Sequence, residues 1–203
     1  YQWYSVAAAI LLIPIIITSI IWFYEKNENN VIFAEDQVAV TLFAPLGSRI
    51  NFSLPDGTKG WLNSGSSIEY NIPFIKNSRN VSLNGEAWFD VATDENHPFE
   101  ITAGKSKVKV LGTKFNMSAY REENYVEVVL EEGKIEFSAY DLGKTLYMKP
   151  NERLTYAKNS INISIAEASK YSAWKEGKLI FKGDPMVEVA RRIERWYNVE
   201  VEL

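Results

Sequence analysis

The densest group of potentially reactive side chains lies in residues 54–70, LPDGTKGWLNSGSSIEY. A phosphate-binding Walker loop needs glycine, four residues, then Gly-Lys-Ser/Thr before a helix. The order Gly-Thr-Lys-Gly at 57–60 does not satisfy that pattern. A nucleophile elbow needs Gly-x-Ser-x-Gly on a strand-to-helix turn, and neither Ser64 nor Ser66 has that frame. The stretch therefore favours two turns between strands over catalysis.

The chain contains few of the residues that bind metals or carry out thiol chemistry. It contains no cysteine and one histidine, His97. Disulfides, thiolate ligands and cysteine nucleophiles are therefore excluded, and a histidine-rich zinc site is not expected. His97 precedes Pro98, as in an exposed turn. The sequence thus predicts no catalytic residue, no metal site and no cofactor.

Carboxylates and tryptophans leave one alternative open. Glycoside hydrolysis uses a pair of carboxylates, and Asp90 and Glu127 occupy outward strand positions. A sugar-binding face needs exposed aromatic rings, and four tryptophans come into question: Trp61, Trp88, Trp174 and Trp196. Solvated carboxylates and core tryptophans are the commoner outcome. A membrane-anchored periplasmic carbohydrate-binding or glycan-processing β protein is therefore kept as the alternative function.

The charge balance argues against nucleic acid as a partner. The 203 residues include 22 Lys and Arg against 26 Asp and Glu, a formal net charge of −4. Binding to phosphate backbones needs clustered cations, and no such cluster is present. The length suits one or two domains with a substantial core.

Residues 1–24 carry no charge and predict a transmembrane helix. Ten Val, Leu or Ile residues between Val6 and Ile21 favour insertion by about 3–6 kcal/mol at about 0.3–0.6 kcal/mol each. Aromatic residues flank the apolar run on both sides, as at the two membrane interfaces. A signal peptide would begin with basic residues and end at a small-residue cleavage site, which this stretch lacks. Residues 25–37 then read as a polar juxtamembrane linker.

Residues 38–168 predict a mainly β domain. Apolar residues alternate with polar ones in short runs, and turn signals separate the runs. Pro55-Asp56-Gly57 predicts a tight turn, and Asn84-Gly85 and Glu132-Gly133 predict two hairpins. Residues 161–165 form the last alternating run. The expected architecture is an antiparallel β-sandwich or β-roll.

Residues 169–203 predict the start of a small βαβ module. A short strand at 179–182 leads to Asp184 as N-cap and Pro185 at the first helical position. Apolar residues then recur at helical spacing up to Tyr197. Asn198 ends the helix, and a second strand begins at Val199. Because this unit is too small to bury its helix alone, we expect more chain or a partner to complete it.

Several of these blocks, in order, resemble the signatures of FecR-like anti-sigma factors. They are LPDGTKGWLNSGSSIEY, RNVSLNGEAWFDVATDENHPFEI and VKVLGTKFNMSAY, within residues 40–155. The last 30 residues resemble the small secretin/TonB short N-terminal module of longer members. One departure is Gly60, where the family usually carries an aliphatic strand residue, and a glycine there is expected to weaken or bulge the strand.

The resemblance implies a regulator that crosses the inner membrane once. A cytoplasmic N-terminal segment, expected to precede Tyr1, would hold an extracytoplasmic-function sigma factor. The periplasmic part, from Glu25 onward, would receive a signal from the signalling domain of a TonB-dependent outer-membrane transporter. The sigma factor is then released, in some members by proteolysis.

A partner domain could add a strand to the βαβ module at either predicted edge. The candidate contact residues are Leu179, Ile180, Phe181, Val199 and Val201. The equally weighted alternative is that these strands simply complete their own sheet.

Overall fold

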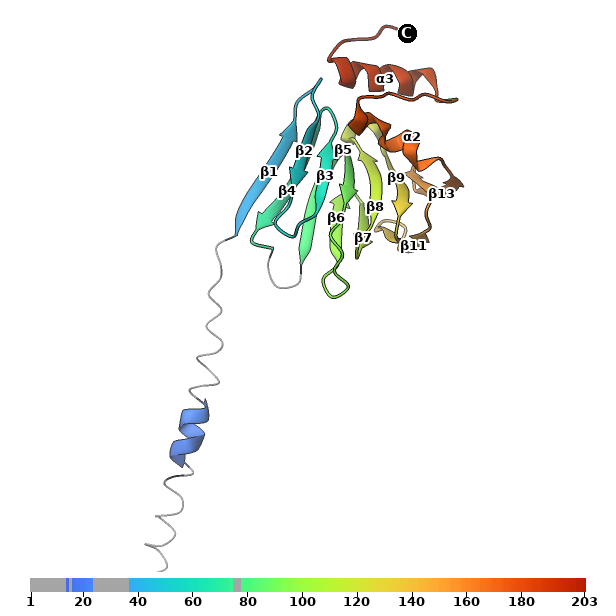
Figure 1. Ribbon diagram of the computed structural model, residues 1–203. Helices are drawn as coiled ribbons and strands as arrows, with labels where there is room; N and C mark the ends of the chain where they lie inside the picture. Colours follow the sequence, from blue (N-terminus) through green and yellow to red (C-terminus); the bar gives the residue numbers. More distant parts are fainter. Residues whose placement is uncertain (1–13, 15, 24–36, 75–77) are drawn as a thin grey trace, which may run out of the picture. The chain divides into compact units, whose positions relative to one another are not determined.

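The computed structural model describes residues 14, 16–23, 37–74 and 78–203 (Figure 1). Most of the predicted membrane span and linker, namely 1–13, 15 and 24–36, lies outside this range. Residues 14 and 16–23 are helical. Across the described ranges, no helix combines the length and the apolar character that a membrane crossing requires. The span of residues 1–24 thus stays a prediction from the sequence.

Residues 37–203 form one compact, mainly β unit. Its first strand begins at Val38, where the sequence predicts the start of the β domain. The thirteen strands described are β1 (Val38–Ala44), β2 (Ile50–Ser53), β3 (Lys59–Leu62), β4 (Ser66–Ile72), β5 (Arg79–Asp90), β6 (Phe99–Ala103), β7 (Ser106–Val110), β8 (Lys114–Ala119), β9 (Tyr125–Glu132), β10 (Ile135–Ala139), β11 (Lys144–Met148), β12 (Glu152–Ala157) and β13 (Ser160–Ile165).

All thirteen strands belong to one hydrogen-bonded sheet that curls into two layers through β5. The first half of β5 pairs with β4 and β6, and this layer continues through β7, β10 and β11. The second half pairs with β3 and β8, and this layer continues through β9, β12 and β13. Strand β1 pairs with β4, and β2 with β3. The predicted β class is confirmed, with one exception to antiparallel pairing: β5 and β6 run parallel.

The hairpin predicted at Asn84-Gly85 is wrong, because β5 continues through both residues without a break. Gly85 marks the point where the strand passes from one layer to the other. Its φ is +105°, and a Cβ there would lie 2.3 Å from the Ser66 Oγ. The glycine therefore serves a sharp change of strand direction, which the dipeptide alone does not distinguish from a turn.

The hairpin predicted at Glu132-Gly133 is also wrong. The turn exists, but β9 pairs with β8 and β12 whereas β10 pairs with β7 and β11. The turn therefore connects the two layers. The Pro55-Asp56-Gly57 turn, in contrast, joins the paired strands β2 and β3 as predicted.

The core lies between the layers and is rich in phenylalanine. The Phe89 ring centroid lies 5.8 Å from that of Phe52, 6.1 Å from that of Phe99 and 5.3 Å from that of Phe115. Gly60 does not bulge its strand, since β3 pairs in regular register on both sides. A Cβ at Gly60 would lie 2.4 Å from the Phe52 ring, so the glycine makes room for this aromatic core.

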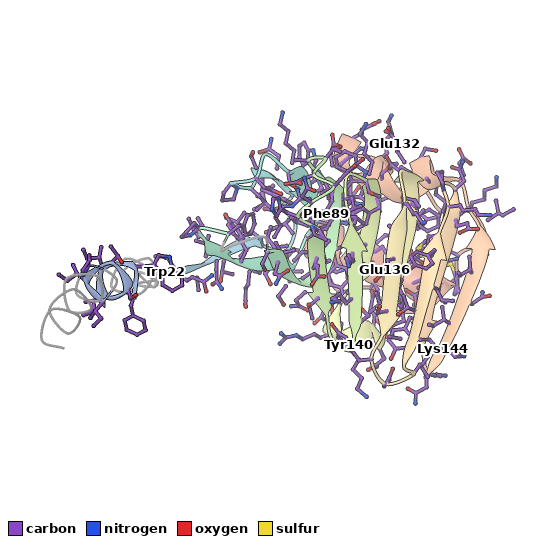
Figure 2. The ribbon with its side chains drawn as sticks, turned by 90° about the horizontal axis from the view of Figure 1, so that it is seen from below. Trp22, Phe89, Glu132, Glu136, Tyr140 and Lys144 are labelled. Carbon is purple, nitrogen blue, oxygen red and sulfur yellow. The ribbon has the colours of Figure 1, made fainter. Side chains whose placement is uncertain are left out.

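Side chains fill the space around Phe89, whereas Tyr140 and Lys144 lie together at the outer edge of the unit, where β10 turns into β11 (Figure 2). The sandwich therefore has a closed aromatic interior, and the turn between β10 and β11 is exposed.

Three helical segments follow the strands: α2 (Ala168–Ser172), the 3-10 helix η2 (Ala173–Glu176) and α3 (Met186–Tyr197). A further 3-10 helix, η1 (Arg121–Glu123), links β8 to β9. The predicted helix is confirmed, and Asn198 ends it in the left-handed conformation with φ +54°. Figure 1 shows α2 and α3 next to each other at one end of the sheet.

Two details of the predicted C-terminal module are wrong. Asp184 does not cap α3, because its carboxylate binds the Lys170 Nζ at 2.8 Å, and Pro185 is the residue before the helix. The segments 179–182 and 199–203 form no strand, since a strand needs a hydrogen-bonded neighbour and neither pairs with another segment of the described chain. The domain boundary at 168/169 stays a prediction.

Candidate functional site

The outer surface of β5, β8, β9 and β12 carries a polar face that the C-terminal helices cover. Strand register places Glu86, Ser118 and Glu127 in one row across β5, β8 and β9. Asn116 and Arg153 lie on the same face in the next row, with Val129 between them. Alternate residues on these strands point into the core. We call Glu86, Asn116, Ser118, Glu127 and Arg153 the polar face.

Glu86 is the centre of a buried hydrogen-bond network on this face. Its two carboxylate oxygens accept hydrogen bonds from the Asn63 Nδ2 at 2.7 Å and the Asn116 Nδ2 at 2.8 Å. The Asn116 Oδ1 accepts one from the Trp174 Nε1 at 3.0 Å. Since a buried carboxylate without partners is strongly unfavourable, these bonds make the position of Glu86 tolerable.

Glu127 and Arg153 form the second charged pair on the face. The Arg153 Nε donates to the Glu127 Oε2 at 2.6 Å, and the carboxylate side chain is 12% exposed. Burial raises the pKa of Glu127, and Arg153 only partly offsets that effect. The sequence placed Glu127 on a solvated surface, and this prediction is wrong because α2 packs against β9.

Trp174 attaches the first helical segment to the polar face. Its side chain is 1% exposed, and Ala168, Ser172 and Ala173 are buried with it. Lys175, next in sequence, places its Nζ 3.5 Å from the centre of the Trp88 ring. Segment α2–η2 therefore covers the outer face of the sheet with a buried contact that is separate from the core between the layers. The other three candidate tryptophans, Trp61, Trp88 and Trp196, are half-buried on the surface.

Helix α3 is held differently, through its last turn. The Arg195 guanidinium binds the Glu123 Oε1 at 2.6 Å and lies 3.9 Å from the centre of the Tyr120 ring. Burial opposes the charge of Arg195, yet Tyr120 and Glu123 together hold its pKa above the usual value. The Glu123 side chain is 1% exposed, so this pair lies inside the contact.

The serine-rich turn of residues 63–66 also contacts the last turn of α3. The Ser64 hydroxyl donates to the Arg195 carbonyl oxygen at 2.5 Å, and the Gly47 N–H donates to that oxygen at 3.0 Å. The Tyr120 hydroxyl donates to the Ser64 carbonyl oxygen at 2.9 Å. The serine that resembled a nucleophile in the sequence thus fixes a helix end.

A cavity of about 370 Å³ remains between the polar face, α2 and α3. Cations and carboxylates line it in similar numbers, including Glu123, Glu127, Arg153, Lys170, Asp184 and Arg192. Most of these charges are paired within the lining. Burial and the nearby Glu123 raise the pKa of Tyr125, whose hydroxyl donates to the Glu188 Oε2 at 3.2 Å. The cavity resembles an interface between two elements more than a catalytic cleft.

The structure does not bring the candidate carboxylates Asp90 and Glu127 together. In strand register Glu127 lies in the row of Glu86, and Asp90 is four residues further along β5. At about 3.3 Å per residue, the rows are about 13 Å apart. In the described part of the chain, no three His, Asp or Glu side chains are placed to hold a metal ion.

The five candidate contact residues flank α3 and differ in exposure. Ile180 is 39% exposed and Val199 is 50% exposed, whereas Leu179, Phe181 and Val201 are half-buried. The Arg192 guanidinium lies 5.4 Å from the centre of the Phe181 ring, and the Val201 N–H donates to the Glu194 Oε1 at 3.0 Å. Leu179 also lies near Arg195 and Trp196, at the inner side of α3.

Comparison with known proteins identifies both parts of this arrangement. The profile of the FecR protein family matches residues 40–136, and that of the FecR C-terminal region matches residues 178–203. The first covers most of the strands and the second covers α3 with its flanking segments. The polar contact around Arg195 therefore joins two separately recognised regions. No curated protein matches the chain significantly.

Two similar crystal structures come from Parabacteroides distasonis ATCC 8503, each of a protein assigned as an anti-sigma factor. One is 33% identical, with a TM-score of 0.75 over 79% of this chain and 76% of its own. The other is 34% identical, with a TM-score of 0.74 over 78% and 75%. With two family profiles and this level of identity over most of its length, the chain belongs to the family of FecR-like anti-sigma factors.

Proposed function

We propose that this chain is the signal-receiving part of an inner-membrane sigma regulator. A signal from a TonB-dependent outer-membrane transporter would reach residues 37–203 in the periplasm. A cytoplasmic N-terminal segment would hold an extracytoplasmic-function sigma factor and release it in response. The observation that carries the proposal is the docked C-terminal region, in which the two segments that flank α3 pair with no strand.

The membrane part of the proposal rests on the sequence. Residues 1–24 are uncharged and long enough to cross the hydrocarbon core once as a helix. Membrane lipid would then surround this helix, and the regulator would cross the inner membrane a single time. This placement puts the sigma-binding segment and the β unit on opposite sides of the membrane.

The proposed partner contact is strand addition beside α3. Segments that lack a strand partner of their own can accept a strand from another protein, and side-chain pockets add specificity. Leu179, Ile180 and Phe181 form one such segment, and Val199 and Val201 lie in the other. Exposed apolar side chains at Ile180 and Val199 fit a folded partner domain with an apolar strand edge, as expected for a transporter signalling domain.

A pull-down with a transporter signalling domain tests this function. A chain that ends at Gly177 keeps Trp174 in place and removes residues 178–203, so its β unit should remain folded. We expect the 203-residue chain to retain the domain and the shortened chain to lose it. Equal retention by both chains would contradict the proposal.

The glycan-processing alternative receives no support from a particular feature of the site. The family is regulatory, and Asp90 and Glu127 lie in separate rows. Turnover of a glycan by the chain alone, lost on replacement of Asp90 or Glu127, would nevertheless overturn the signalling proposal.

A further inference from the structure

We propose that residues 178–203 act as a releasable latch, in which α3 leaves the polar face while α2–η2 stays in place. Only the purpose of the latch, to free the segments around α3 for a partner, rests on the proposed function. The movement itself follows from how the two helical segments are held.

Segment α2–η2 and helix α3 differ in how many of their side chains are buried. Segment α2–η2 buries four of its nine residues, including the whole Trp174 indole. Helix α3 has twelve residues and buries one, Ala190. Met186 and Val187 at its start and Tyr197 at its end are 65%, 50% and 65% exposed. Val189, Ile193 and Trp196 of α3 are half-buried, so α3 also makes apolar contacts, but none of its large side chains is buried as completely as Trp174.

The polar contacts that hold α3 are ones that water can replace. They include the Arg195–Glu123 ion pair, the Ser64 hydrogen bond to the Arg195 carbonyl oxygen, and the Tyr125–Glu188 hydrogen bond. The Arg49 guanidinium also lies 3.7 Å from the centre of the Trp196 ring. When α3 leaves, Glu123 becomes hydrated, so release leaves no charge buried without a partner.

A flexible joint lies between the two segments. Gly177 ends η2 with φ +81°, and no atom of another residue lies within 4 Å of the position of a Cβ. Residues 178–185 contain neither helix nor strand. A rotation at this joint breaks the Lys170–Asp184 ion pair, which links α2 to the joint. It leaves Trp174 undisturbed, because Trp174 lies on the other side of Gly177.

Release should be visible as loss of helix. A twelve-residue helix is marginal in water without packing, so backbone amides of α3 lose protection when it leaves the face. The same movement removes Leu179 from beneath α3 and frees the segment of Val199 and Val201. Strand addition by a partner and release of the latch would then be linked.

Hydrogen exchange followed by mass spectrometry tests the latch without any partner. The 203-residue chain is compared with Arg195→Ala, which removes the buried pair. The matched control is Arg191→Ala, since Arg191 pairs with Glu188 of the same helix and its side chain is 40% exposed. All three are measured in mild detergent because residues 1–24 are uncharged.

We expect Arg195→Ala to speed exchange in residues 186–197 at least tenfold, with residues 168–176 and strands β8 and β9 unchanged. Arg191→Ala should change exchange in 186–197 less than threefold. Equal acceleration of residues 168–176 and 186–197 would overturn the proposal, because the two segments would then open as one lid. Unchanged exchange in Arg195→Ala would overturn it as well.

A cross-link gives a second test in a chain that has no cysteine of its own. A Cβ at Gly47 would lie 3.5 Å from the Asn198 Cβ, within the usual range for a disulfide. Comparing the oxidised and reduced forms of one Gly47→Cys/Asn198→Cys variant cancels any backbone strain at position 47. We expect exchange in residues 186–197 to be at least tenfold slower when oxidised, and equal rates would count against the latch.

The same variant separates the latch from the proposed function. If a transporter signalling domain binds the reduced form alone, both proposals are supported. If oxidation slows exchange but neither form binds the domain, the latch stands and the proposed partner is wrong. If both forms bind equally, partner binding does not need release and the linkage is wrong.

Discussion

Segment α2–η2 and helix α3 lie next to each other on the same sheet but are attached by opposite means. The first inserts an indole that is 1% exposed, and its nitrogen donates to Asn116. The second rests on a guanidinium paired with a carboxylate and on hydrogen bonds to turns. Apolar burial and buried ion pairs respond differently to substitution, to pH and to water. The C-terminal region therefore combines a permanent anchor with a contact that can open.

Replacing Trp174 by alanine should produce the largest effect. It removes the largest buried side chain of the region and leaves the Asn116 Oδ1 without its donor, so we expect a loss of about 3–5 kcal/mol in the free energy of unfolding. Urea denaturation measures it. Trp174→Phe should cost much less, since most of the apolar contact remains. A loss below about 1 kcal/mol for Trp174→Ala would show that burial of Trp174 contributes little to stability.

Replacing Arg195 by alanine should have an intermediate effect. Glu123 loses its partner inside the contact, for which we expect a cost of about 1–3 kcal/mol. Release of α3 limits the cost because the carboxylate then reaches water. Urea denaturation of Arg195→Ala, Glu123→Gln and the double variant forms a cycle. We expect the double variant to be less destabilised than the sum of the two, and strict additivity would contradict a direct pair.

The pH dependence of stability should single out Glu127. Burial raises its pKa above 4.5, so the folded protein binds this proton more tightly than the unfolded chain does. The stability contribution of Glu127 therefore increases as pH falls from above the raised pKa toward 4.5, and it changes no further below both values. Replacement by glutamine removes this change.

Urea denaturation at pH 7 and pH 5 tests the prediction. We expect the unfolding free energy of the unaltered chain to increase relative to Glu127→Gln on going to pH 5. An unchanged or decreased difference would contradict it. Asp184 acts in the opposite direction, because Lys170 overcomes the effect of burial and lowers its pKa.

Lys178→Ala should have the smallest effect. The Lys178 Nζ lies 3.2 Å from the Glu176 Oε2, but the two side chains are 66% and 61% exposed. Such surface pairs contribute about 0–1 kcal/mol, so urea denaturation should detect almost no change. If Lys178→Ala lowered the free energy of unfolding as much as Arg195→Ala does, buried and exposed ion pairs would not differ in their contribution to stability.

The sequence predicts most strands and the family because alternation and turn residues are local signals. It fails at Asn84-Gly85 since a glycine that redirects a strand between layers and a glycine in a turn look alike. It also fails for Glu127. The alternation in β9 predicts a side chain exposed to solvent, but α2 packs over it and buries it. Neither error can be corrected from neighbours in sequence.

The candidate site was only partly predictable. The helix ending at Asn198 follows from spacing and capping, and its apolar neighbours follow from composition. The contacts of Arg195 with Glu123 and with residues 63–66 join positions more than seventy residues apart. A charged residue on an amphipathic helix reads as solvated unless the facing surface is known. The sequence treats Trp61, Trp88, Trp174 and Trp196 alike as core candidates, and only the packing of α2–η2 on the sheet distinguishes the buried Trp174 from the other three.

Titration of a transporter signalling domain into the 203-residue chain tests the central claim most directly. Ile180→Asp places a charge in the proposed contact, and Ile163→Asp in β13 is a matched control, since the two side chains are 39% and 38% exposed. We expect Ile180→Asp to weaken binding at least tenfold and Ile163→Asp to bind like the unaltered chain. Equal affinity of all three chains for the domain would contradict it.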